Sequence, residues 1–155
     1  KGMTVFPRNK DGQPILWDYQ IKGFFKDACG SLRKIKESKS SGIRAYKKEI
    51  DGLIFIEERE ILIQTKEPIE SCQRPLRAQT AQGDKNSLAN SEEIAAGAVM
   101  EFSIIVMSDG LVPAVKEWLS YGKLRGLGQW RNSGKGRFVC KILEERLAEF
   151  ADILE

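Results

Sequence analysis

The residues with the clearest chemical potential form a glycine-rich segment at positions 124–138. Four glycines fall within eleven positions, Gly126, Gly128, Gly134 and Gly136, as two G-x-G pairs. Glycine accepts positive φ and allows another backbone or a ligand to come close. The amides of such a segment can therefore turn toward phosphate oxygens, as they do in anion-binding nests. We expect these four glycines to contact a phosphate chain.

Cations and one aromatic ring are interleaved with the glycines. They are Lys123, Arg125, Arg131, Lys135, Arg137 and Trp130. Arginine forks bind phosphate oxygens, and an aromatic face stacks on bases of a single strand. Amides, cations and a stacking surface together favour contact with a nucleic acid. In the alternative interpretation, Trp130 is a buried anchor and the glycines only form a tight turn.

Two common phosphate-binding motifs do not fit this segment. A Walker loop requires Ser or Thr after its lysine, whereas Lys135 is followed by Gly136. A dinucleotide fingerprint lies between a strand and the helix after it, whereas this segment is predicted to run from a helix into a strand. The segment is therefore interpreted as a nucleic-acid contact rather than a nucleotide site.

Histidine is absent from all 155 residues. This excludes Ser-His and Cys-His nucleophile pairs, histidine bases and histidine metal ligands within the chain. The three cysteines are widely spaced, without a C-x-x-C pair, and fit free thiols in a reducing cytoplasm. We predict no catalytic residue, metal or cofactor. A metal-dependent ribonuclease using Asp51 or Asp84 remains open as an alternative.

The net charge of +3 conceals two cationic segments. Residues 21–48 hold nine basic and two acidic residues, and residues 123–141 hold six basic residues and no acid. Acids gather elsewhere, with five against one basic residue in 142–155. This pattern is typical of a protein with one face toward a polyanion, although solvated basic faces are the simpler explanation. Further phosphate contacts are predicted at Lys22, Lys26, Arg74 and Arg77.

Apolar periodicity and turn residues predict the elements that position these side chains. They are a helix that begins at Asp18, a flexible basic loop at 37–42, a hairpin of strands 53–56 and 61–64 with a charged tip, a strand at 99–107, a helix with Pro113 in its first turn, a strand at 137–143 and a helix at 147–154.

This order favours the α+β class with an antiparallel sheet. A split β-α-β, ferredoxin-like plan fits if a first strand lies at 4–7 or precedes Lys1, since the chain is compatible with residues missing upstream. We expect a single domain over 1–155, with an insertion or long hairpin at 68–97. No apolar run reaches the roughly 20 residues of a membrane span, and no leader is apparent, so a cytoplasmic protein without membrane contact is expected.

The predicted helix, the sequence GLGQWRNSGKGRF and the predicted strand after it resemble the C-terminal half of the RAMP (repeat-associated mysterious protein) superfamily of CRISPR effector complexes. The Trp-Arg pair within the loop is more similar to RAMP-like proteins of phages and prophages. Residues 12–16 and 21–28 resemble the segment that leads into the first helix of the family, and residues 74–80 and 91–94 resemble phage relatives.

This resemblance implies a ferredoxin-like (RAMP- or RRM-like) antiparallel sheet with helices on one face, and binding of guide or target RNA. It also implies the cytoplasm of a bacterial host or phage-infected cell, with a homo-oligomer or a larger nucleoprotein assembly as context. Because family members that cut RNA often use histidine, the resemblance implies RNA binding more than cleavage. A protein interface in a homo-oligomer or phage assembly, without nucleic acid, stays open as a second hypothesis.

Overall fold

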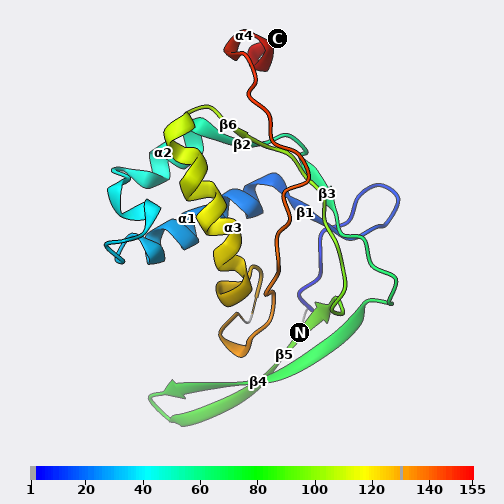
Figure 1. The fold of residues 1–155 in the computed structure, drawn as a ribbon. Coiled ribbons are helices and arrows are strands. Elements are labelled where there is room, and N and C mark those ends of the chain that lie inside the picture. The colour runs from blue at the N-terminus through cyan, green and yellow to red at the C-terminus, as the bar shows by residue number, and fades with distance from the viewer. Residues whose placement is uncertain (1–2, 130) are drawn as a thin grey trace. The chain divides into compact units, whose positions relative to one another are not determined.

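The computed structural model describes residues 3–129 and 131–155, without the side chains of 74–76, 78 and 85–87. Its chain divides into two compact units. The hairpin unit comprises Lys1–Trp17 and Glu58–Phe102, and the helical unit comprises Asp18–Glu57 and Ser103–Glu155. All described helices lie in the helical unit, whereas the described elements of the hairpin unit are antiparallel strands. The chain as a whole mixes helices with small antiparallel sheets, which confirms the α+β class (Figure 1).

Helix α1, Asp18–Leu32, is the centre of the helical unit. Its apolar residues recur at three- and four-residue steps, and this spacing buries Ile21, Phe24, Phe25, Ala28 and Cys29. The Phe25 ring lies 5.4 Å from the Trp118 ring of α3, between ring centroids. The helix predicted to begin at Asp18 is confirmed.

The basic stretch after α1 is ordered, contrary to the predicted flexible loop. It forms the 3-10 turn η1, Lys39–Gly42, and the helix α2, Tyr46–Leu53. Ser40 is buried and accepts a hydrogen bond of 2.8 Å from Trp118 Nε1. The serines that suggested flexibility instead supply hydrogen-bonding groups for a compact turn, because each hydroxyl both donates and accepts.

Helix α3, Val112–Arg125, follows the 3-10 turn η2, Asp109–Leu111, and has a proline in its first turn as predicted. It buries Ala114, Val115, Trp118, Leu119 and Gly122. Phe138 returns from the C-terminal segment onto Gly122, where a Cβ atom would lie 2.1 Å from the Phe138 ring.

The predicted hairpin of 53–56 with 61–64 is wrong. Strand β2, Ile54–Ile56, pairs with β6, Ile104–Val106, and β3, Glu60–Leu62, pairs with β1, Ile15–Trp17. Both pairings are antiparallel. The apolar faces of β2 and β3 belong to the cores of different units, so short separation along the chain does not make these strands partners. The predicted strand at 99–107 is shortened to β6.

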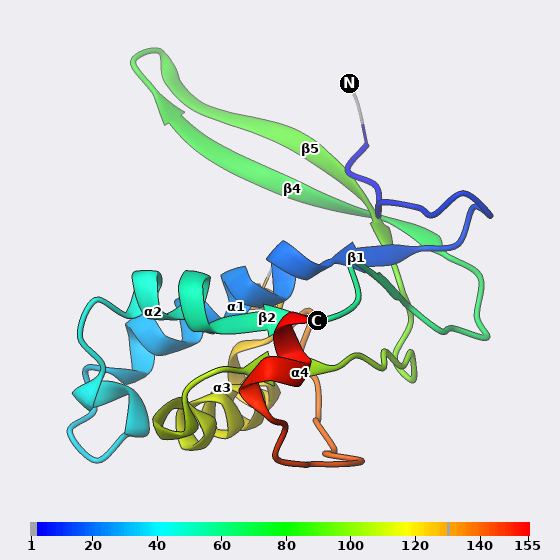
Figure 2. The same ribbon diagram turned by 90° about the horizontal axis from the view of Figure 1, so that it is seen from above.

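Strands β4, Glu70–Thr80, and β5, Gly83–Glu93, form one long antiparallel hairpin in the hairpin unit. Figures 1 and 2 show it as a twisted two-stranded ribbon. The turn uses Gly83 at φ 107° and a hydrogen bond of 2.6 Å from the Thr80 hydroxyl to the Gly83 carbonyl. Residues 4–7 contribute a single bridge, from Thr4 to Ser91, instead of a strand.

The predicted strand at 137–143 is also wrong. In the part of the chain that the structure describes, residues 137–149 carry neither helix nor strand, and the last helix, α4, is limited to Phe150–Leu154. The apolar residues that predicted a strand are present, but no neighbouring strand offers a ladder of hydrogen bonds. None of the helices described is long and apolar enough to cross a membrane.

Candidate nucleic-acid interface

The glycine loop, residues 126–137, connects α3 to the C-terminal segment. All four of its glycines have positive φ, between 73° and 87°. Two hydrogen bonds of 3.0 Å fix the start of the loop, from the Gly126 amide to the Gly122 carbonyl and from the Leu127 amide to the Gly136 carbonyl. The second bond joins the two G-x-G pairs, so the loop is closed upon itself.

Close packing of backbone on backbone explains two of the glycines. A Cβ atom at Gly136 would lie 1.8 Å from the Leu127 carbonyl oxygen, and one at Gly126 would lie 2.7 Å from the Gly136 carbonyl carbon. Two predicted phosphate-binding amides are also occupied, because Gly126 donates to Gly122 and Gly134 donates to Arg131. Gly126 and Gly136 therefore shape the loop, whereas Gly128 is exposed and has no atom within 4 Å of its Cβ position.

One carboxylate of α1 binds an arginine just before the loop and another in its middle. The Arg125 guanidinium donates to both Asp27 oxygens, at 2.9 and 3.1 Å, and Arg131 Nη1 donates to Asp27 Oδ2 at 2.9 Å. The hydrogen bond from Arg125, followed by the charge of Arg131, holds the pKa of Asp27 below its ordinary value. These two arginines, predicted to bind phosphate, are thus engaged in positioning the loop.

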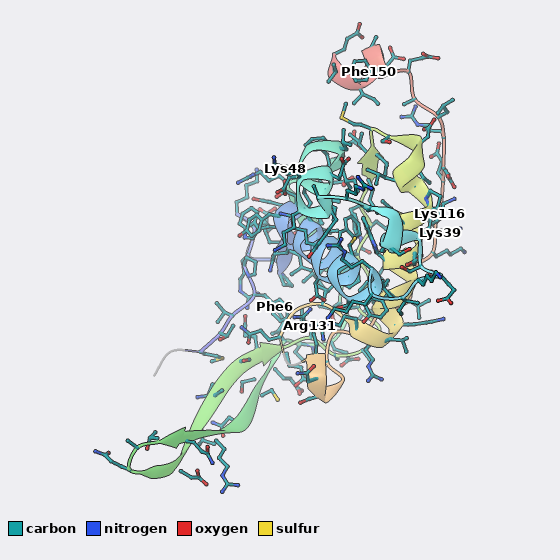
Figure 3. The ribbon with its side chains drawn as sticks, turned by 90° about the vertical axis from the view of Figure 1, so that its left-hand side faces the viewer. Phe6, Lys39, Lys48, Lys116, Arg131 and Phe150 are labelled. Carbon is teal, nitrogen blue, oxygen red and sulfur yellow. The ribbon has the colours of Figure 1, made fainter. Side chains whose placement is uncertain are left out.

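The remaining cations of the loop lie nearer to solvent. Lys123 and Arg137 are exposed, and Lys135 is half-buried. Figure 3 labels Arg131, which marks the position of the loop within the helical unit. Trp130 lies outside the described residues, so both interpretations of its ring stay open. Lys123 and Arg137 form no ion pair within the described chain and are the side chains best placed to meet a phosphate.

The predicted contacts Lys22 and Lys26 serve another purpose in this structure. Lys26 Nζ lies 2.6 Å from an Asp51 carboxylate oxygen, and this hydrogen bond lowers the pKa of Asp51. Lys22 Nζ donates to the Asp51 carbonyl at 3.1 Å and lies 4.6 Å from the centre of the Phe55 ring. Both lysines are half-buried, and they connect α1 to α2 and β2.

The predicted phosphate contacts Arg74 and Arg77 belong to the hairpin unit. Arg77 forms an ion pair with Asp84 across the hairpin, and its Nε donates to Asp84 Oδ2 at 3.0 Å. The side chain of Arg74 lies outside the described part. Arg77 thus belongs to the hairpin unit, whereas the glycine loop belongs to the helical unit.

The residues predicted from the sequence to form the site do not include a basic surface on α2. Arg44, Lys47 and Lys48 are exposed around the start of α2, and the Arg33 guanidinium lies 5.0 Å from the centre of the Tyr46 ring. Arg33, Ala45, Tyr46, Lys47 and Lys48 line a shallow hollow. The apolar residues Tyr46 and Ile50, four positions apart, were the available sequence signal for this helix.

The acidic residues considered for metal chemistry are each paired with a cation. Asp51 contacts Lys26 in the helical unit, and Asp84 contacts Arg77 in the hairpin unit. Within the described residues, no three His, Cys, Asp or Glu side chains are grouped so that they could hold a metal ion. No observation in this part of the chain therefore supports a metal-dependent ribonuclease.

No protein-family model matches this chain, and a search of curated proteins found no similar sequence.

Proposed function

We propose that the helical unit is a non-catalytic module that binds RNA or another single-stranded nucleic acid. One observation carries the proposal: eleven exposed cations of this unit form no ion pair among the described residues. Five of them make up two surfaces, the glycine-loop surface (Lys123 and Arg137) and the α2 surface (Arg44, Lys47 and Lys48). The others are Arg33, Lys34, Lys36, Lys39, Lys141 and Arg146. Unpaired cations are the groups that neutralise phosphates and release counterions.

The hydrogen bonds that hold the loop support the same proposal. Asp27 fixes Arg125 and Arg131, and the Leu127 to Gly136 hydrogen bond closes the loop before any ligand arrives. A loop that is already ordered loses little conformational entropy on binding. Lys123 in the last turn of α3 and Arg137 at the end of the loop then extend from a backbone that is held in place.

A finer assignment, a RAMP-like module with a ferredoxin-like sheet, belongs to the proposal as well. The order of α3, glycine loop and extended segment supports it, together with the motif in residues 126–138. Under this assignment the module acts in the cytoplasm of a bacterial host or phage-infected cell, within a nucleoprotein assembly.

Salt dependence of RNA binding tests the proposal. The affinity for a short, fluorescently labelled single-stranded RNA is measured by anisotropy between about 50 and 200 mM salt. We expect the dissociation constant to rise steeply with salt, because phosphate contacts release counterions. The proposal would be contradicted if no RNA binding were detected at low salt, or if the dissociation constant did not change over this range of salt concentration.

Paired variants locate the binding surface. Lys123→Ala/Arg137→Ala and Lys47→Ala/Lys48→Ala are each expected to weaken RNA binding roughly tenfold at fixed salt and to lower the salt slope. Lys10→Ala/Lys66→Ala is the matched control, since it removes two exposed lysines of the hairpin unit and changes the net charge equally. If RNA binding were weakened equally in all three variants, only the net charge of the protein would matter, and the two proposed surfaces would be rejected.

A further inference from the structure

The C-terminal segment, residues 137–149, is an uncoiled chain that pairs with no strand among the described residues. Figure 1 shows it as the uncoiled trace that leads to α4. The Phe138 amide donates to the Gly122 carbonyl, and the next backbone amide that donates to a described carbonyl is that of Asp152. The backbone amides of 139–149 therefore make no backbone hydrogen bond within the described chain.

Apolar side chains of this segment and of α4 are open to solvent. Val139 is 90% exposed and Leu147 is 85% exposed. The other exposed apolar side chains are Ile142, Leu143, Phe150 and Leu154. Extended backbone with free amides and exposed apolar side chains is the surface to which another strand adds. An intermolecular partner would bury these side chains and pair these amides.

The order of charges along the segment points to a second copy of the same chain. In an antiparallel pair with its two-fold axis at Leu143, Val139 of one copy faces Leu147 of the other. Arg137 then faces Glu149, and Lys141 faces Glu145. Every charged residue on this face meets the opposite charge, and each pair occurs twice by symmetry.

Neighbouring registers lose this match. An axis at Ile142 places Val139 opposite Glu145, and an axis at Glu144 places Val139 opposite Glu149. On the face that carries Arg137 and Lys141, charge complementarity therefore selects the register about Leu143; on the opposite face, Ile142 faces Glu144 and Cys140 faces Arg146.

We propose that two copies of the chain associate by antiparallel pairing of residues 137–149 about Leu143. Phe138 fixes the start of the segment on the helical unit, with its ring 5.2 Å from the Phe24 ring. Glu145 lies 2.8 Å from Lys116 of its own chain, which holds its carboxylate near the surface where Lys141 of the second copy arrives. Figure 3 labels Lys116, which forms this ion pair, and Phe150, the first residue of α4. The proposal shares Arg137 with the glycine-loop surface, but its register and its tests depend on Lys141, Leu143 and Glu145, which the proposed RNA-binding surfaces do not include.

Cysteine cross-linking tests the register. In the full chain carrying Cys72→Ser and Cys140→Ser, with buried Cys29 retained, Leu143→Cys places two thiols across the axis. Facing residues of an antiparallel pair have Cα atoms about 4.5–5.5 Å apart, within the range that a disulfide spans. We expect a covalent dimer under mild oxidation. Val139→Cys is the control, since its two copies lie about 26 Å apart along the strands, and it should stay monomeric on a non-reducing gel.

Charge reversal provides a second measurement, by sedimentation of the otherwise unmodified chain. Lys141→Glu should raise the dissociation constant of the dimer about tenfold, because two attractive pairs become repulsive. Adding Glu145→Lys should restore association relative to either single variant. Circular dichroism confirms that the variants are folded. A chain that stays monomeric at all concentrations, equal cross-linking at 139 and 143, or a dimer unaffected by Lys141→Glu would each overturn the proposal.

Discussion

Gly136 shows how one missing side chain decides the shape of the glycine loop. Its φ is +80°, and the Leu127 carbonyl oxygen occupies the space where a Cβ atom would be. Gly128 also has positive φ, but its Cβ position is empty. The two glycines therefore separate the cost of backbone strain from the cost of steric overlap.

We expect Gly136→Ala to lower the free energy of unfolding by more than about 2 kcal/mol, because it adds a clash to the left-handed conformation. Gly128→Ala should cost only about 1 kcal/mol, the strain alone. Urea unfolding followed by circular dichroism measures both. Equal losses would mean that the loop does not pack as described.

Asp27 links pH to the stability of the helical unit. Its folded pKa is lowered by Arg125 and Arg131, so its stabilising effect is present above the unfolded pKa of about 3.9. As pH falls through the folded pKa, the carboxylate is protonated and this contribution is lost. The side chain is 27% exposed, which limits screening by solvent.

Asp27→Asn should cost about 1–2 kcal/mol at neutral pH and should flatten the loss of stability between about pH 5 and pH 2. Urea unfolding at a series of pH values gives both quantities. Asp11→Asn is the control, because this exposed acid has no side-chain hydrogen bond in the described chain. A pH profile of Asp27→Asn that matches the unmodified chain would contradict the role of the carboxylate.

The elements predicted correctly are those whose patterns are local. The three- and four-residue spacing of α1 and the proline of α3 are sufficient for these helices. The pairing of β2 with β6 is set by two cores that the sequence does not reveal, and so the hairpin at 53–64 was wrong. The apolar alternation after residue 137 predicts a strand, but not whether a partner exists within the chain.

The candidate site divides in the same way. Its glycines and cations were visible in the sequence, because they lie within one short segment. The engagement of Arg125 and Arg131 was not visible, since Asp27 lies 98 and 104 residues away. Helix α2 was hidden because its apolar pair is surrounded by charged residues, which resemble a solvated loop.

The turn η1 and helix α3 are joined by a buried hydrogen bond, and this junction can be tested. Ser40→Ala leaves the Trp118 N–H buried without its acceptor and should cost about 1–3 kcal/mol of unfolding free energy. Ser41→Ala, at an exposed neighbouring hydroxyl, should cost clearly less. Urea unfolding of the two variants provides the comparison, and equal costs would show that the buried bond contributes nothing specific.

Charge is divided unevenly between the two units of the molecule. The helical unit holds 17 basic and 13 acidic residues, whereas the hairpin unit holds 8 basic and 9 acidic. Buried apolar residues occur in both units, and those of the hairpin unit are Ile15, Leu16, Ile61 and Ile63. Long β4 and β5 add only Ser91 to the described buried residues.

Removal of residues 73–90, with a two-glycine turn in their place, should therefore leave the helical unit folded. Hydrogen exchange followed by mass spectrometry should show unchanged protection of peptides from α1 and α3. Gly136→Ala is the opposite control, since it should reduce protection in α3 and spare β4 and β5. Loss of protection in α1 upon removal of the hairpin would show that the units are not independent.

The clamp at Asp27 also sets an order of events during synthesis. At about 5–20 residues per second, its first arginine partner is made roughly 5–20 seconds after the carboxylate itself. Until then, α1 has left the ribosome without α3, without Phe138 against Phe24 and without the charges that neutralise Asp27. The helical unit is thus completed only when nearly the whole chain has been translated, and truncated products would carry an unfinished core.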